Sequence, residues 1–157
     1  MKNGTLLAAI DLGSNSFRLE ICRFNNGILH RSEYIKEAVR QGSGLDEDRN
    51  LSASSMEKGW ECLSRFAERL AGFHSSQVRA VATQTLREAR NRHVFLEKAH
   101  QILGFPIEVV SGREEARRLG ATFRLHGVPV AEVRSSPWCR CLDTALFGQQ
   151  GQRPVEA

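Results

Sequence analysis

The stretch AAIDLGSNSFRLEICRF, residues 8–24, decides how the chain begins to fold. An apolar run reaches Asp11, is interrupted by the small residues 13–16 (Gly-Ser-Asn-Ser), and resumes as an alternating pattern. In that pattern Phe17, Leu19 and Ile21 share one side. Alternation with a period of two is typical of a strand with one buried face. The stretch therefore predicts two strands joined by a short polar turn.

The polar turn has two interpretations. Asp and Asn side chains commonly cap their own backbone in an ordinary hairpin turn. Alternatively, Gly13 lets the backbone approach a phosphate closely, while Ser14, Asn15 and Ser16 add hydroxyl, amide and backbone N–H donors. Asp11 then suits Mg²⁺, directly or through water, because Mg²⁺ keeps several waters and uses few carboxylates. Taken alone, these residues favour the ordinary turn.

The pattern beyond this stretch predicts an α/β fold with a mixed sheet. Asn26-Gly27 is a strong hairpin signal, so the first three strands form an antiparallel meander. We expect the following elements in order: a polar loop over 41–50, a helix over 52–71, a strand over 78–83, one or two helices over 85–104, a strand over 107–111 and a helix over 112–123. The order β-β-β-α-β-α-β-α predicts about five strands with flanking helices.

The helix over 52–71 has a choice of N-terminal caps. Ser52 is one candidate, and Ser54 with Glu57 three residues later forms a capping-box pattern. Apolar residues recur at helical spacing along it, at Met56, Trp60, Leu63, Ala67 and Leu70. We expect this stripe to face the core.

Polar clusters follow three of the predicted strands, at residues 11–16, 83–87 and 111–115. If these strands run parallel, the clusters meet at one edge of the sheet, where α/β folds bind ligands. Arg87 suits a bidentate bond to phosphate, although a surface ion pair is its simpler role.

Glu114 and Glu115 are adjacent, so only one of them should face such a cleft. That carboxylate could orient and deprotonate a water for attack on phosphorus. As a lone signal, acids in the first turn of a helix are better explained by the helix dipole.

Composition restricts the other function classes. The 157 residues are 41% hydrophobic and 25% charged, which is typical of an ordered globular domain, and the net charge is +4. No basic block is interleaved with aromatic residues, so we expect no nucleic-acid partner. No apolar run is long enough to span a membrane, and no signal peptide is evident, so we expect a cytoplasmic protein. The histidines and cysteines show no metal-ligand spacing.

Three motifs, IDLGSNSFRLEI (10–21), ATQTLREARN (82–91) and IEVVSGREEAR (107–117), resemble in order and spacing the exopolyphosphatase / guanosine pentaphosphate phosphohydrolase (Ppx/GppA) family. The resemblance covers residues 7 to about 118, three quarters of the chain. It implies the actin-like, ribonuclease-H-like ATPase fold, in which two domains close on a phosphate-binding cleft. It also implies Mg²⁺-dependent removal of a terminal phosphate from inorganic polyphosphate or guanosine pentaphosphate.

The resemblance assigns roles by position. Asp11 to Ser16 match the first phosphate loop, Arg87 matches the arginine that contacts substrate phosphate, and Glu115 matches the base that activates water. Polyphosphate is our main expectation because exopolyphosphatase is the broader family label. Guanosine pentaphosphate hydrolysis and a non-catalytic phosphate-binding half-site are the alternatives.

The chain also departs from the family pattern. The family continues with a second phosphate loop, Asp-x-Gly-Gly-Gly-Ser, and a second domain, but no consecutive glycines follow Glu115. We expect residues 1–123 to form the N-terminal phosphatase domain and 124–157 a divergent, poorly ordered tail of the kind a frameshift produces. We therefore expect little or no hydrolysis by this chain alone, and self-association through the face where a second domain would dock.

Overall fold

The computed structural model describes residues 2–111, whose strands form one five-stranded sheet in the order β3-β2-β1-β4-β5. The strands are β1 Leu6–Leu12, β2 Phe17–Asn25, β3 Ile28–Glu37, β4 Val78–Ala82 and β5 Ile107–Val109. β1, β2 and β3 pair antiparallel, whereas β4 and β5 run parallel to β1. The predicted antiparallel meander and mixed sheet are confirmed.

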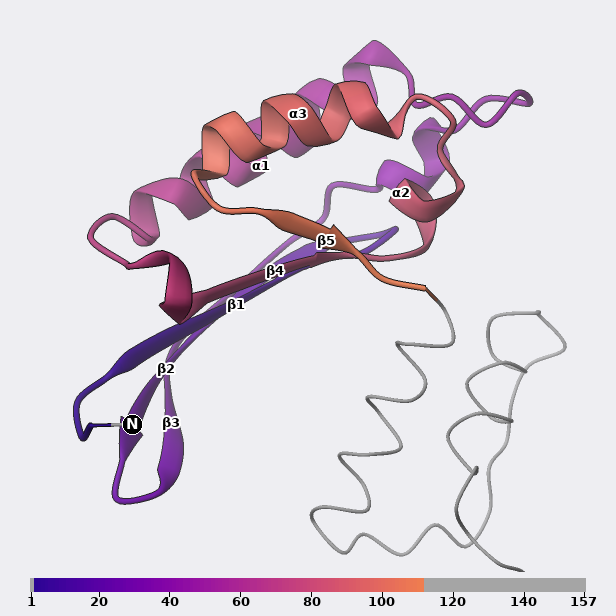
Figure 1. Ribbon diagram of the computed structural model, residues 1–157. Coiled ribbons are helices and arrows are strands. Elements are labelled where there is room, and N and C mark those ends of the chain that lie inside the picture. The colour runs from indigo at the N-terminus through magenta and orange to yellow at the C-terminus, as the bar shows by residue number, and fades with distance from the viewer. Residues whose placement is uncertain (1, 112–157) are drawn as a thin grey trace, which may run out of the picture. The chain divides into compact units, whose positions relative to one another are not determined.

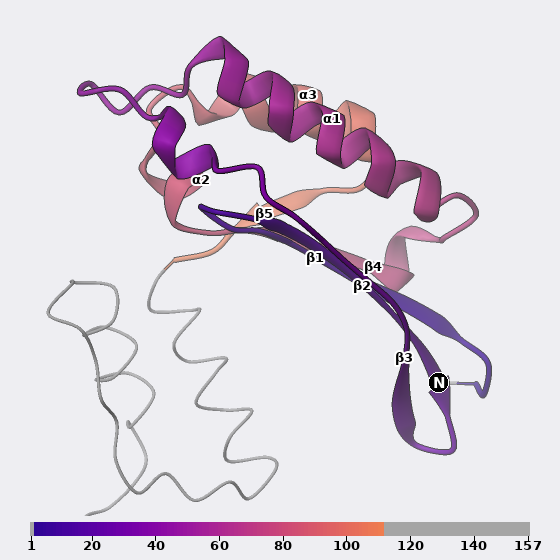
Figure 2. The same ribbon diagram turned by 180° about the vertical axis from the view of Figure 1, so that it is seen from behind.

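Helices cover one face of this sheet. They are α1 Ala53–Arg69, α2 Gln84–Glu88 and α3 Arg92–Leu103, with 3-10 helices η1 Gln41–Gly44 and η2 Ser75–Gln77. Figures 1 and 2 show α1 and α3 side by side across the sheet, with α2 at the end where β1 and β4 finish. The stretch 85–104 thus contributes two helices. The helix predicted over 112–123 lies outside the described residues.

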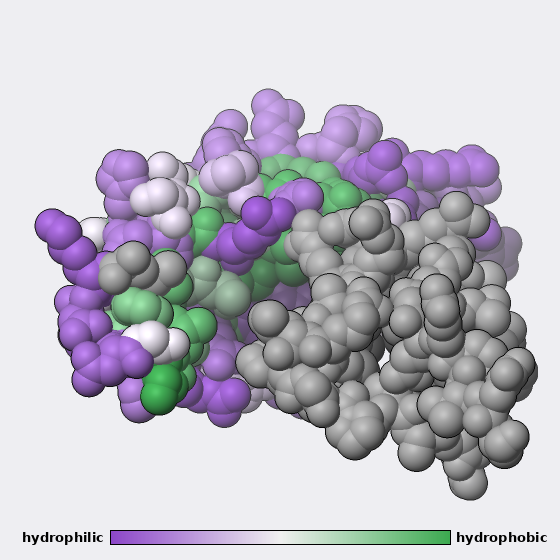
Figure 3. Space-filling view, turned by 60° about the horizontal axis from the view of Figure 1, so that its bottom comes forward, coloured by the Kyte–Doolittle hydropathy of each residue, from purple (hydrophilic) through white to green (hydrophobic). Residues whose placement is uncertain are grey.

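Alternation on the central strands defines the core face. Ile10 and Leu12 on β1, and Phe17, Leu19 and Ile21 on β2, are all at most 6% exposed. The intervening side chains point to the opposite face, as a period of two requires. That face carries hydrophobic side chains bordered by hydrophilic ones (Figure 3). The predicted buried side of residues 17–21 is confirmed.

The buried face of α1 is wider than the predicted stripe. Met56, Leu63 and Leu70 are buried as expected, but Cys62 and Phe66 are also completely buried. The reason is that α1 packs against both the sheet and α3, so a second row of its side chains is covered. Burial, reinforced by a nearby carboxylate, raises the pKa of the Cys62 thiol to about 12, so this thiol is an inert core group.

An aromatic cluster joins α1, α3 and the sheet at the centre of the core. Phe95 on α3 is completely buried and stacks on Trp60 of α1, with ring centroids 5.9 Å apart. It also meets Phe17 edge-to-face at 6.5 Å. Aromatic pairs prefer both arrangements over a direct face-to-face sandwich. The cluster therefore fixes β2 at the residue where the chain leaves the polar turn.

The boundaries of two predicted elements need correction. The segment 41–50 is not simply a polar loop, because it contains η1 and a β-bridge between Leu45 and Leu51. Ser52 is the N-cap of α1, and its Oγ accepts a hydrogen bond from the Ser55 N–H at 3.3 Å. The capping box starting at Ser54 does not form. With Ser52 as its N-cap, the helix begins two residues earlier than that pattern predicts.

None of the helices within residues 2–111 has the length and apolar character needed to cross a membrane.

Candidate phosphate-binding site

Parallel pairing brings two of the predicted clusters together. Leu12 pairs with Ala82 at the carboxyl ends of β1 and β4, so residues 11–16 and 83–87 leave the sheet at the same edge. Thr83 reinforces this junction, since its N–H and Oγ1 both donate to the Leu12 carbonyl, at 3.3 and 3.4 Å. β5 ends at this edge too, but residues 112–115 of the third cluster, including Glu114 and Glu115, lie outside the described residues.

The 13–16 loop between β1 and β2 is held from behind by another segment of chain. The Arg40 N–H donates to the Asn15 carbonyl at 2.9 Å, and the Gly42 N–H donates to the Ser14 carbonyl at 2.8 Å. We call Arg40–Gly42 the 40–42 segment. Because it engages the loop's carbonyl oxygens, the direction of the loop's peptide groups is set by a contact remote in sequence.

The loop's N–H groups remain available to a ligand. Within residues 2–111 the backbone N–H groups of Ser14, Asn15 and Ser16 have no hydrogen-bond acceptor. Ser16 is only 6% exposed, and the buried Ser14 Oγ also has no partner in this part of the chain. Successive backbone N–H groups in a turn can together bind an anion.

Gly13 is required by close approach rather than by its φ angle. A Cβ at this position would lie 2.9 Å from the Ser16 carbonyl oxygen and 4.0 Å from Asp11 Oδ2. The first distance is shorter than real Cβ contacts, so any side chain would force the loop open. The Gly13 N–H meanwhile donates to that same Ser16 carbonyl at 3.2 Å, which closes the loop at its base.

Asp11 lies directly before the loop, on the sheet face opposite the helices. It is the cross-strand neighbour of Arg18, and Arg18 Nη1 is 3.8 Å from Asp11 Oδ2. Its side chain is 39% exposed. Burial raises the pKa of the Asp11 carboxyl above its usual value, and Arg18 offsets part of this rise. The carboxylate is thus held in a partly desolvated place directly before the 13–16 loop.

The described residues suit a divalent cation only if waters and substrate phosphate supply most of its ligands. Among residues 2–111 no three His, Cys, Asp or Glu side chains converge, so an all-protein metal cage is absent from this region. One half-exposed carboxylate beside a phosphate loop does suit Mg²⁺, which binds through one or two carboxylates, waters and substrate phosphates. Asp11 is the residue that would hold it.

Arg87 occupies the last turn of α2, at the same edge. Its N–H donates to the Thr83 carbonyl at 3.0 Å, and its own carbonyl accepts from Arg92 Nη1 at 2.7 Å. The side chain is half-buried. Since Thr83 is bonded to β1, the helix carrying Arg87 is anchored to the strand that carries Asp11.

Sequence reasoning missed the 40–42 segment. Gln41 is completely buried, and neither its Nε2 nor its Oε1 has a partner in the described part of the chain. Nothing periodic marks a single buried glutamine inside a polar stretch. The available signal was the pair of glycines at 42 and 44, which indicates a crowded turn as readily as a flexible loop.

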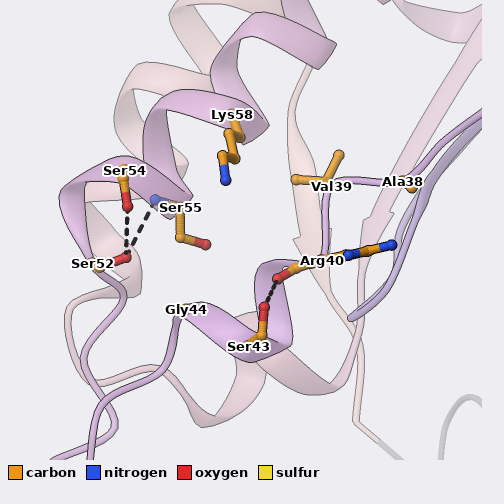
Figure 4. A pocket seen from close by; sticks show the side chains of 9 residues that line it. All are labelled: Ala38, Val39, Arg40, Ser43, Gly44, Ser52, Ser54, Ser55 and Lys58. Atoms are coloured by element: carbon orange, nitrogen blue, oxygen red, sulfur yellow. Dashed lines mark hydrogen bonds between the residues drawn. The ribbon is translucent and has the colours of Figure 1, made fainter.

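A hydroxyl-rich cavity of about 510 Å³ lies between this segment and the start of α1. Its polar lining comes from Arg40, Ser43, Ser52, Ser54, Ser55 and Lys58. Figure 4 shows the Lys58 ammonium and the Ser55 hydroxyl turned into the cavity, whereas the Arg40 side chain points away. Among its lining side chains two are basic and none is acidic.

Comparisons with known proteins identify the family of the chain. The profile of the Ppx/GppA phosphatase family matches residues 21–131. Proteins named guanosine-5'-triphosphate,3'-diphosphate pyrophosphatase are similar to the chain: that of Vibrio parahaemolyticus is 55% identical over 111 residues, 71% of this chain and 22% of that protein. The one from Vibrio vulnificus is 53% identical over 114 residues, 73% of this chain and 23% of that protein. The chain thus spans less than a quarter of these relatives' length.

Solved structures give the same result. The Aquifex aeolicus Ppx/GppA family member is 28% identical with a TM-score of 0.69, over 76% of this chain and 39% of that one. An exopolyphosphatase from Cytophaga hutchinsonii is 25% identical with a TM-score of 0.71, over 83% of this chain and 42% of that chain. The predicted resemblance and fold class are confirmed, and the domain boundary after residue 123 lies outside the described residues. The chain belongs to the Ppx/GppA phosphatase family, whose members are phosphatase hydrolases.

Proposed function

We propose that this chain carries the first phosphate-binding half of an enzyme that removes the terminal phosphate of guanosine-5'-triphosphate,3'-diphosphate. The names of the Vibrio relatives, whose sequences are more than 50% identical to this chain in the matched region, support this substrate. They favour it over inorganic polyphosphate, our main expectation from the sequence. Polyphosphate hydrolysis remains the second candidate because a solved relative is named an exopolyphosphatase, at 25% identity.

The observation that carries this proposal is the set of free N–H groups in the 13–16 loop. The 40–42 segment takes up the carbonyls of Ser14 and Asn15, so the peptide N–H groups are left for the oxygens of a terminal phosphate. Hydrogen bonds to a charged oxygen are shorter and about twice as strong as neutral ones. Arg87, anchored through Thr83, would supply the second contact to the same phosphate.

The proposed reaction is a phosphoryl transfer to water. Water attacks the terminal phosphorus, the bond to the leaving 5'-diphosphate oxygen breaks, and a base accepts the proton of the water. We assign that base to Glu115, as the family resemblance implies. Mg²⁺, when bound at Asp11 through water, would offset phosphate charge. Asp11 and the loop thus position the phosphate, and Arg87 stabilises the charge on its oxygens.

This chain alone should bind better than it hydrolyses. Acceleration in such sites depends on preorganised donors around the whole transferring group, and one loop supplies only one side. A phosphate-binding half-site without catalysis is therefore the expected behaviour of the isolated chain. Self-association through the surface where a second domain would dock is a further prediction, which gel filtration at several concentrations tests.

The test is a titration of the full chain with guanosine-5'-triphosphate,3'-diphosphate, tripolyphosphate and inorganic phosphate, with and without Mg²⁺, by calorimetry. We expect the guanosine nucleotide to bind tightest and Arg87→Leu to weaken all three, whereas the exposed control Arg90→Leu changes nothing. Tighter binding of tripolyphosphate would favour the second candidate. Phosphate release that survives Glu115→Gln would remove Glu115 from the role of base.

A further inference from the structure

The 40–42 segment crosses the end of the sheet to reach the proposed site. β3 lies at the sheet edge, two strands away from β1, and ends at Glu37. The chain then passes behind the 13–16 loop, where its two backbone N–H groups bind the loop's carbonyls. Both ends of this short segment therefore contact the loop, and the Gly42 end also lies close to α2.

Gly42 is the point where the loop and α2 come together. A Cβ on Gly42 would lie 3.2 Å from Thr85 Oγ1, 3.3 Å from the Ser14 carbonyl oxygen and 3.4 Å from Ser14 Cβ. The first two distances are tighter than ordinary Cβ contacts, so a side chain would have to separate its two neighbours. Thr85 is only 4% exposed, and it cannot simply turn outward.

The segment is held in place at an energetic cost. Arg40 has φ 53° and ψ 41°, the left-handed region that non-glycine residues rarely adopt. Gln41 is completely buried, with an amide that finds no partner among the described residues. Costs of this kind persist where surrounding contacts determine the conformation, and they concentrate at functional sites. An ordinary connection between a strand and a helix requires neither.

We propose that Gly42 is a positioning residue of the phosphate site, which sets the spacing between the 13–16 loop and the helix that carries Arg87. This inference rests on the proposed function and deepens it. Gly42 touches no substrate: its N–H fixes the direction of the Ser14 peptide, and its missing side chain lets Thr85 approach. Loop and arginine can then contact the same phosphate.

The test compares Gly42→Val and Gly42→Ala with Gly44→Ala in the full chain. Gly44 belongs to the same turn, but its Cβ would meet Ser55 of α1 at 2.3 Å instead of the loop, so it controls for lost stability. At a temperature where all variants are folded, inorganic phosphate is titrated by NMR. We expect Gly42→Val to weaken binding about tenfold, the equivalent of one charge-assisted hydrogen bond, and Gly42→Ala less.

A second readout needs no ligand. In Gly42→Val the amide resonances of residues 14–16 should shift, whereas in Gly44→Ala they should stay in place. Unchanged resonances, or equal loss of affinity in Gly42→Val and Gly44→Ala, would overturn the positioning role. If the resonances shift in Gly42→Val but the unaltered chain binds neither phosphate nor tripolyphosphate, Gly42 still sets the conformation of the 13–16 loop, but the proposed function falls.

Discussion

The two turns of the antiparallel meander are determined in different ways. The turn between β2 and β3 consists of Asn26 and Gly27, with φ values of 49° and 82°, and its local sequence suffices to specify it. The 13–16 loop between β1 and β2 contains no residue with positive φ. It is shaped instead by hydrogen bonds from the 40–42 segment. The first turn is a local structure, whereas the second is a tertiary one.

The difference explains why the opening stretch was ambiguous. Residues 11–16 fit both a self-capping turn and a phosphate loop, because the choice depends on where their carbonyls and N–H groups go. That is decided by the N–H groups of Arg40 and Gly42, which lie more than twenty residues away. If this account is right, substitutions at the two turns should have different effects.

The largest effect should come from the core beneath the 13–16 loop. Phe95→Ala should lower the free energy of unfolding by about 3–5 kcal/mol, since it removes a completely buried ring that contacts Phe17 and Trp60. Denaturant unfolding measures the loss. Val94→Ala on the same helix is the control, because Val94 is 46% exposed and should change stability by less than about 0.5 kcal/mol. Similar losses in both would mean that the cluster does not anchor β2.

Gly13→Ala should affect both stability and binding. The new methyl would lie 2.9 Å from the Ser16 carbonyl oxygen, so the loop must open, at a cost of about 1–3 kcal/mol. Opening moves the N–H groups of residues 14–16 apart, and we expect phosphate affinity to fall at least about tenfold. Phosphate titration of the folded variant measures it. Unchanged affinity would reduce the 13–16 loop to an ordinary hairpin turn.

Gly27→Ala is the matched change at the other turn. Nothing lies within 4 Å of a Cβ there, so the only penalty is the positive φ, about 1–2 kcal/mol. Phosphate affinity should not change. Gly27→Asn should recover much of the stability because Asn tolerates the left-handed region. Thermal unfolding of the two variants checks this order, and a loss of phosphate binding in either would contradict the separation of the two turns.

The same contrast shows which parts of the fold and of the site could be predicted from the sequence alone. Strands with alternating burial, such as Phe17 to Ile21, and the Asn26-Gly27 turn were predictable because their signals are local. The edge shared by Asp11 and Arg87 followed from parallel pairing. The 40–42 segment was not predictable, since a buried Gln41 and a left-handed Arg40 are stable only because of contacts with distant residues.

The smallest effect should be that of Asp11→Asn, and its sign is informative. Burial outweighs Arg18 and raises the pKa of Asp11 above 3.8 in the folded state, so folding is opposed once the carboxyl ionises. The penalty is absent below pH 3.8, grows as the pH rises through the folded-state pKa, and is constant above it. Asp11→Asn should therefore raise the melting temperature slightly at pH 7 and leave it unchanged below pH 3.8. At pH 7 the same variant should lose any Mg²⁺-dependent gain in nucleotide affinity.

A variant that is less stable at pH 7 would mean that the ion pair with Arg18 outweighs burial and that Asp11 is an ordinary cross-strand partner. Greater stability together with weaker Mg²⁺-dependent binding is the combination expected of a carboxylate kept for a ligand.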